Sequence, residues 1–251
     1  MEELLRIIAA NTAPKDSMSL TVKGNKTKII TNHNPPIELD SSKSYEMALV
    51  DLETYYSFPN IDTTRNAIKW SPDDGTTWHD FKLPIGAYEL SDIEEAIQNE
   101  VVKKGGKKTS IEIQPNKVTL KAILKLSNGY RVDFNVENSL RDALGFDAKI
   151  YDQQYVESEN VVNILNINVI HVNVDVISGS YVDGTHEPVI YSFFPNVDPG
   201  HKIVEKPQNL VYLPVHVRNI DRMTVTITNQ DGKLLDLRGE QVSARFHLRE
   251  K

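Results

Sequence analysis

Most of this chain consists of short segments in which apolar and polar residues alternate, separated by clusters of turn-forming residues. In "NINVIHVNVDVIS" (residues 166–178), Ile170, Val172, Val174 and Val176 alternate with Asn, His and Asp. A period of two places the apolar side chains on one face of a strand and the polar ones on the other, as in antiparallel sheets with one solvated face. Clusters such as "SPDDG", "SNGY", "VDGTHEP" and "NVDPGH" supply the turns. The pattern predicts an all-β sandwich or barrel.

The alternation in residues 166–178 changes phase between Val169 and Ile170. Because a shift of one residue moves every side chain to the other face, this change predicts a β-bulge at that point or a break into two strands. Further strands are predicted at residues 20–23, 28–31, 45–55, 67–70, 78–83, 110–113, 117–126, 130–135, 189–194, 210–217, 222–228 and 241–248.

Two segments carry helical patterns instead. "LSDIEEAIQNEVVKKGG" predicts a helix with Ser91 as the N-cap and Glu94 completing a capping box. "NSLRDALGF" predicts a shorter helix that is capped by Asn138 or Ser139 and ended by Gly145. The chain has no internal repeat or flexible linker, so we expect one elaborated β-domain.

Composition excludes several functional classes. The 251 residues contain no cysteine, which removes disulfides, thiolate nucleophiles and cysteine-bound zinc. The net charge of −7 argues against a protein that coats nucleic acid. We expect no membrane span, because no apolar run approaches the required ~18–20 residues. The start "MEELLRIIAANTAPKD" lacks the basic region of a signal peptide, which predicts a protein that is not secreted by that route, and residues 2–10 are a third candidate helix.

The short motifs favour local structural explanations. "SPDDGTTW" (residues 71–78) fits the Asp-box turn of sialidase-like propellers, but a propeller needs one such turn in each blade and the chain has one, so we expect a hairpin turn. "KKGGKKT" (residues 103–109) lacks residues of a phosphate loop and follows a helix, so we expect a solvated loop. The seven histidines show no metal-binding spacing. We therefore expect no catalytic, cofactor or metal site.

The last stretch, "TVTITNQDGKLLDLRGEQVSARFHL", predicts two strands and a turn in which Gly232 takes the left-handed conformation. The final strand places Val242, Ala244, Phe246 and Leu248 on one face, and Ser243, Arg245, His247 and Arg249 on the other. The end of the chain is therefore expected inside a sheet, with a cationic stripe facing away from the core.

Three blocks of sequence resemble a known family. "VRNIDRMTVTITNQDGKLLDLRGEQVSARFHLRE" is similar to the C-terminal end of jelly-roll capsid proteins in Polinton-like (adintovirus-type) DNA viruses and elements. "PPIELDSSKSYEMALVDLETYYSFPNI", followed by "LPIGAYELSDIEEAIQ", and "NSLRDALGF" resemble the same family in the same order. The closest resemblance is to the smaller, penton-type minor capsid protein, because the two-jelly-roll major capsid protein needs a longer chain.

The resemblance implies a fold and a role. The fold is an all-β, antiparallel jelly-roll β-sandwich over residues 1–251, and the excess of predicted strands adds an inserted subdomain, within about residues 60–150, that carries one or two short helices. The role is that of a structural virion protein, located at the capsid vertex, that forms homopentamers at the five-fold axes and contacts the double-jelly-roll major capsid protein. No catalytic residue and no cofactor are implied.

Five residues are candidates for interactions. Phe58, Phe193 and Phe194 lie in "YYSFPNI" and "YSFFPNV", which would act as aromatic anchors at an interface or would fill the core. Arg245 and Arg249 would face solvent in a monomer, and acidic neighbours or packaged DNA, through a weak contact, in an assembly. A second hypothesis is a glycan- or ligand-binding β-sandwich such as a viral spike or host-recognition domain.

Overall fold

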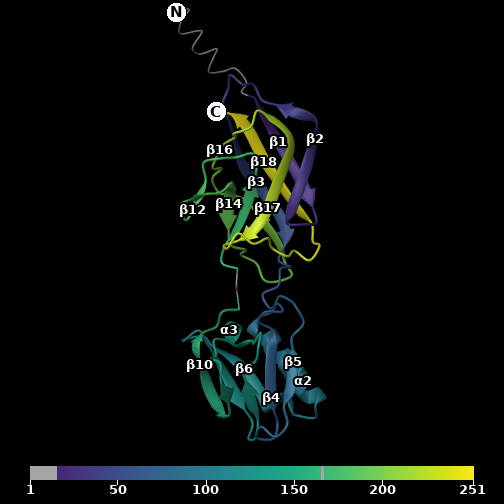
Figure 1. The fold of residues 1–251 in the computed structure, drawn as a ribbon, viewed down its shortest axis with the longest axis vertical. Coiled ribbons are helices and arrows are strands. Elements are labelled where there is room, and N and C mark those ends of the chain that lie inside the picture. The colour runs from purple at the N-terminus through teal and green to yellow at the C-terminus, as the bar shows by residue number, and fades with distance from the viewer. Residues whose placement is uncertain (1–15, 165–166) are drawn as a thin grey trace, which may run out of the picture. The chain divides into compact units, whose positions relative to one another are not determined.

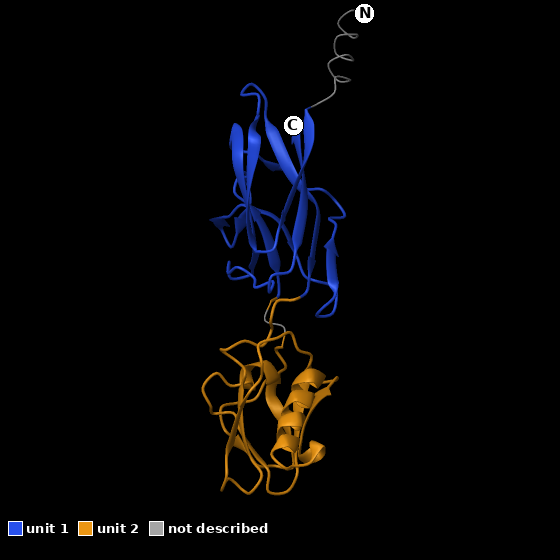
Figure 2. Cartoon of the chain, turned by 90° about the vertical axis from the view of Figure 1, so that its right-hand side faces the viewer, with its two compact units in different colours: residues 1–56, 168–251 blue, residues 57–167 orange. Residues whose placement is uncertain are grey.

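A computed structural model describes residues 16–164 and 167–251. The candidate helix at residues 2–10 lies outside the described residues. The chain divides into two compact units: unit 1 is Met1–Tyr56 with Asn168–Lys251, and unit 2 is Ser57–Ile167 (Figure 2). Residues 60–150, where an insertion was expected, fall within unit 2.

Unit 1 is a sandwich of two antiparallel sheets (Figure 1). One sheet has the order β1-β18-β3-β15, with β16 also paired to β3, and the other has the order β14-β11-β17-β2. A five-stranded and a four-stranded antiparallel sheet connected in this order form a jelly roll. The strands are β1 (Ser17–Gly24), β2 (Lys28–Glu38), β3 (Tyr45–Tyr55), β11 (Ile170–Val174), β14 (Val189–Phe193), β15 (Lys202–Glu205), β16 (Leu213–Pro214), β17 (Asn219–Asn229) and β18 (Val242–Glu250), with a small hairpin of β12 (Tyr181–Val182) and β13 (Thr185–His186).

The alternation in the sequence produces the core of unit 1. On β18, Val242, Ala244, Phe246 and Leu248 are at most 1 % exposed, as the sequence predicts for its inner face. Burial of an apolar side chain as large as Phe246 contributes about 1.5–3 kcal/mol. The same alternation buries Val172 and Val174 of β11 and Val225 and Ile227 of β17 in the other sheet. The predicted all-β jelly-roll sandwich is therefore confirmed.

Three predicted strands of unit 1 were wrong in their extent, and the first, predicted at residues 28–31, continues to Glu38 as β2. Ile170 begins β11, and the described residues 167–169 form no strand, so neither a bulge at Val169–Ile170 nor a second strand absorbs the change of phase. The register shift in this part of the sheet lies further along, between Val172 and Asn173 against β14. The strand predicted at residues 210–217 shrinks to Leu213–Pro214, because it pairs with β3 over only two residues.

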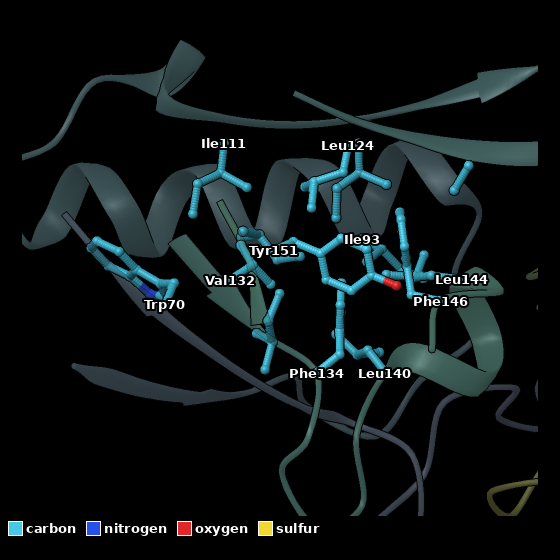
Figure 3. Close-up of a cluster of buried hydrophobic side chains, with 14 of the residues drawn as sticks. Trp70, Ile93, Ile111, Leu124, Val132, Phe134, Leu140, Leu144, Phe146 and Tyr151 are labelled. Atoms are coloured by element: carbon cyan, nitrogen blue, oxygen red, sulfur yellow. The ribbon is translucent and has the colours of Figure 1, made fainter. Parts of the chain in front are cut away.

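Unit 2 has a core of its own between two small sheets and a helix (Figure 3). Trp70, Ile93, Leu124 and Tyr151 come from four different elements and Phe134 directly follows a fifth, and all are buried in this cluster. The sheets have the orders β10-β7-β6 and β5-β4-β8-β9. The elements are β4 (Ala67–Ser71), β5 (His79–Lys82), α2 (Leu90–Lys103), η1 (Lys108–Ser110), β6 (Ile111–Asn116), β7 (Lys121–Leu126), β8 (Arg131–Asp133), α3 (Arg141–Leu144), β9 (Ile150–Tyr151) and β10 (Tyr155–Val161).

The N-cap of helix α2 lies two residues before the predicted one. Its N-cap is Glu89, whose backbone N–H donates to the Asp92 carboxylate at 2.8 Å, so the predicted capping box of Ser91 and Glu94 is wrong. Glu94 instead accepts hydrogen bonds from the backbone N–H of Ile113 at 3.2 Å and from the Gln98 side chain at 3.0 Å. The carboxylate of Glu94 thus ties the helix to β6, and it is not available to the helix terminus.

Gly145 ends α3, as the sequence predicts, in the left-handed conformation with φ of 81°. A Cβ atom at this position would lie 2.3 Å from the carbonyl oxygen of Asn160. The short helix therefore packs so closely against the end of β10 that only glycine fits.

Replacing Gly145 by alanine should destabilise unit 2 more than the same change at Gly105. Gly105 also has a positive φ, of 89°, but no atom lies within 4 Å of its would-be Cβ. We expect Gly105→Ala to cost about 1 kcal/mol for the backbone conformation, and Gly145→Ala about 1–3 kcal/mol more for the clash. Urea unfolding followed by tryptophan fluorescence measures this, since both tryptophans, Trp70 and Trp78, belong to unit 2. Equal losses for the two variants would contradict the close packing.

Glu159 of β10 links the two sheets of unit 2. Its carboxylate accepts hydrogen bonds from Lys149 Nζ and Tyr151 Oη, both at 2.6 Å, and from the backbone N–H of Asp147 at 3.1 Å. Partial burial by itself raises the pKa of Glu159, but the hydrogen bonds from Lys149 and Tyr151 outweigh it and lower the pKa from 4.5 to about 2. The folded unit therefore favours the ionised carboxylate.

The stability of unit 2 should fall when Glu159 is protonated. Because its pKa is lower in the folded state, the stabilisation is complete above pH 4.5 and is lost as the pH falls toward about 2. We predict that Glu159→Gln lowers the urea midpoint at pH 6 and flattens its decrease between pH 4.5 and 2. Glu137, which is exposed and makes no side-chain hydrogen bond within the described residues, provides the matched Glu→Gln control. Parallel pH profiles for wild type and Glu159→Gln would refute this role.

Candidate functional site

The outer face of β18 carries the predicted cationic residues, and each lies beside a partner. Arg245 forms an ion pair with Asp51 of β3. Arg249 contacts the Glu46 carboxylate at 2.7 Å, and its guanidinium lies 3.5 Å from the ring centroid of Tyr212. The antiparallel register sets these pairs, because it places Arg245 opposite Asp51 and Arg249 opposite Glu46. The charge of the stripe is thus matched by carboxylates of the same sheet.

Neighbouring charges on this sheet are matched in the same way. Lys202 of β15 donates to Glu53 of β3 at 2.6 Å, and this hydrogen bond lowers the pKa of Glu53. Lys43 bridges Asp16 at 3.0 Å and Glu250 at 3.3 Å, next to the end of the chain. Exposed ion pairs of this kind contribute little to stability. Their consequence is that the outer face of this sheet presents few unmatched charges.

The three candidate aromatic residues have different environments. Phe58 is 2 % exposed and Phe193 is 8 % exposed, so both are buried within the chain. Phe194 is 46 % exposed, because it follows the end of β14. Of the three, Phe194 is therefore the side chain that presents an apolar surface to a partner.

The Asp-box-like segment forms the turn of the β4–β5 hairpin, as expected. Ser71 Oγ accepts the backbone N–H of Gly75 at 2.9 Å, and the Asp73 carboxylate accepts that of Thr77 at 2.7 Å. These bonds, with the one from Ser71 Oγ to Asp73 at 2.9 Å, occupy the polar side chains of the turn. The glycan-binding hypothesis therefore gains no support from this loop.

The lysine-rich segment lies at the surface. Lys103, Lys104, Lys107 and Lys108 are exposed where α2 ends, as expected for a solvated loop. Within the described part of the chain, no group of three or more His, Asp or Glu side chains is arranged to hold a metal ion. None of the described helices is long and apolar enough to cross a membrane.

A surface that the sequence does not reveal lies along one edge of the sandwich in unit 1. A shallow groove of about 400 Å³ is lined by residues of β12, β14 and β16 and of the loops beside them, among them Tyr181, Ile190, Val211 and Leu213. Tyr181 is 69 % exposed and Val211 61 % exposed. The segment "SYVDGTHEP" indicates only a turn, so its position beside residues 211–213 could not be predicted.

The strand order and the two-layer core define unit 1 as a jelly-roll domain, an architecture that also occurs in viral capsid and lectin domains. Among solved structures, the chain is similar to the mavirus penton protein, known from a crystal structure of its selenomethionine-labelled form. The two share 12 % sequence identity with a TM-score of 0.53, over 94 % of this chain and 99 % of that chain. At this identity the likeness shows a shared fold. No family model and no curated protein matches the sequence.

Proposed function

We propose that the protein is a structural virion protein: a penton-type minor capsid subunit that forms homopentamers at the five-fold vertices of an icosahedral capsid. The observation that supports this most strongly is the extent of the likeness to the mavirus penton protein. A match over 94 % of the chain includes most of unit 2 as well as the jelly roll, because unit 2 alone covers residues 57–167. The three sequence blocks that resemble penton-type proteins support the same role independently.

The proposed partners follow from this role. They are further copies of the chain and the double-jelly-roll major capsid protein that surrounds a vertex. A weak contact with packaged DNA is a third proposal. For it, the exposed lysines at 104, 107 and 108 are better candidates than Arg245 and Arg249, whose charges are already paired with Asp51 and Glu46.

The purified protein should assemble into a five-membered ring. We expect light scattering and native mass spectrometry to give five times the chain mass of 28.4 kDa, and negative-stain images to show rings. Since apolar contacts and opposite charges are expected between subunits, the fraction of rings should rise with protein concentration and change with salt.

Co-expression with the major capsid protein provides the control for assembly that needs a partner. Rings that form only in its presence would still agree with a vertex subunit. Monomers at every concentration and salt, both with and without the major capsid protein, would contradict the proposed function.

A further inference from the structure

The sandwich of unit 1 has two open edges. The first edge consists of β1 and β2, the outermost strands of the two sheets on one side. The second edge consists of β14 in one sheet and of β15 and β16 in the other, with the β12–β13 hairpin beside them (Figure 1). Edge strands expose unpaired backbone groups, so a stable protein must cover or protect them.

The first edge is basic. Lys23 at the end of β1, Lys26 in the following turn and Lys28 at the start of β2 are all exposed. None of these three ammonium groups takes part in an ion pair with the described residues. Ile30, two residues further along β2, is 53 % exposed. The turn end of this edge therefore presents three unmatched positive charges and one apolar side chain, while the exposed Glu38 lies at the opposite end of β2.

The part of the second edge near the β12–β13 hairpin is acidic and apolar. Asp183 is exposed and Glu187 is half-buried, and neither carboxylate forms an ion pair within the part of the chain that the structure describes. Next to them lies the groove that Tyr181 and Val211 line, with both side chains more than 60 % exposed. These two carboxylates have the opposite sign to the three lysines of the first edge, while the exposed Lys206, just after β15, adds a positive charge elsewhere on the second edge.

The two edges are also aligned across the sheet. Lys28 of β2 pairs with Thr226, Thr226 pairs with Asn173, and Asn173 pairs with Val189 of β14. Lys28 and Val189 are thus the two ends of one row of paired residues, and Glu187 lies two residues before Val189. Lys28 and Glu187 therefore sit at similar heights on opposite sides of the four-stranded sheet.

We propose that the second edge of one copy docks on the first edge of the next copy. On the outer face of β18, Arg245 and Arg249 pair with carboxylates of β3. The lysines at the β1–β2 turn and the carboxylates near the β12–β13 hairpin are instead of opposite charge and have no ion-pair partner among the described residues. An interface between two different surfaces of the same protein is heterologous. Repeating such an interface around a rotation axis produces a ring when the rotation closes. The inference rests on the proposed homopentamer and assigns its interface.

Reversal of the charges on one edge tests the interface. Lys26→Glu/Lys28→Glu makes both edges acidic, and Asp183→Lys/Glu187→Lys makes both basic. We expect each double variant to need at least tenfold more protein to form rings at low salt, and the variant with all four changes to assemble as the wild type does. Matched controls in unit 2 are Lys103→Glu/Lys104→Glu and Glu137→Lys/Asp152→Lys, which change exposed residues and shift the net charge equally. These should leave assembly unchanged.

The outcomes separate this inference from the proposed function. If both double variants assemble as the wild type does, the proposed interface is wrong, although the pentamer itself is not contradicted. The same conclusion follows if the variant with all four changes fails to regain assembly. Absence of rings in the wild type, with and without the major capsid protein, would overturn both.

A photo-crosslinking residue at Val211 identifies what occupies the groove. In a mixture of isotopically labelled and unlabelled protein, we expect cross-links to residues 23–30 of a different copy. Cross-links to residues 1–15 of the same chain would show that the groove binds the protein's own N-terminal segment, and would overturn the proposed interface.

Discussion

The fold of unit 1 depends on strand β18, near the C-terminal end of the sequence, lying between β1 and β3, which are near its N-terminal end. β18 pairs with β1 on one side and with β3 on the other, so residues near 20, 50 and 246 must meet before the sheet exists. Its inner face places Phe246 at the centre of the core, fully buried. Without β18, β1 would have no partner in its sheet, and the apolar faces of β3 and β17 would be exposed to water. Pairings between residues so distant in sequence are slow to form, because the chain must close long loops first.

The same arrangement explains how a second folded unit can interrupt the first. β3 ends at Tyr55 and β11 begins at Ile170, and the whole of unit 2 lies in this connection. Unit 2 buries its own aromatic and aliphatic cluster, including Trp70 and Phe134, and ties its elements together with polar contacts such as those of Glu94 and Glu159. The jelly roll therefore depends on this connection only to join the end of β3 to the start of β11. The inserted unit contributes no strand to either sheet of the jelly roll.

The sequence predicted most of the features that depend on local pattern. β3 was predicted with the correct bounds, and both faces of β18 were correct because strict alternation decides burial in a strand. The left-handed Gly232 and the end of α3 at Gly145 were predicted because glycine adopts positive φ angles more readily than other residues. The capping of α2 was predicted wrongly because Glu94 accepts a hydrogen bond from Ile113 of β6, a tertiary contact that the local sequence does not indicate. Strand β15 was not predicted, because an alternating pattern over four residues is too short to recognise.

The candidate interaction residues show the same limit. The outward direction of Arg245 and Arg249 followed from alternation, but the carboxylates that neutralise them come from β3, which is far away in sequence. Phe58 and Phe193 are buried while Phe194 is exposed, a difference that the shared motif could not indicate. The contrast between paired charges on one face and unpaired charges on the two edges appears only when distant strands are placed side by side.

The most direct test of the account is a cryo-electron microscopy structure of the assembled protein. The account predicts a five-membered ring in which Lys23, Lys26 and Lys28 of each copy face Asp183 and Glu187 of its neighbour, with Val211 covered by the contact. A ring held together through unit 2, or through the outer face of β18, would contradict the assigned interface. An assembly without five-fold symmetry would contradict the proposed vertex role itself.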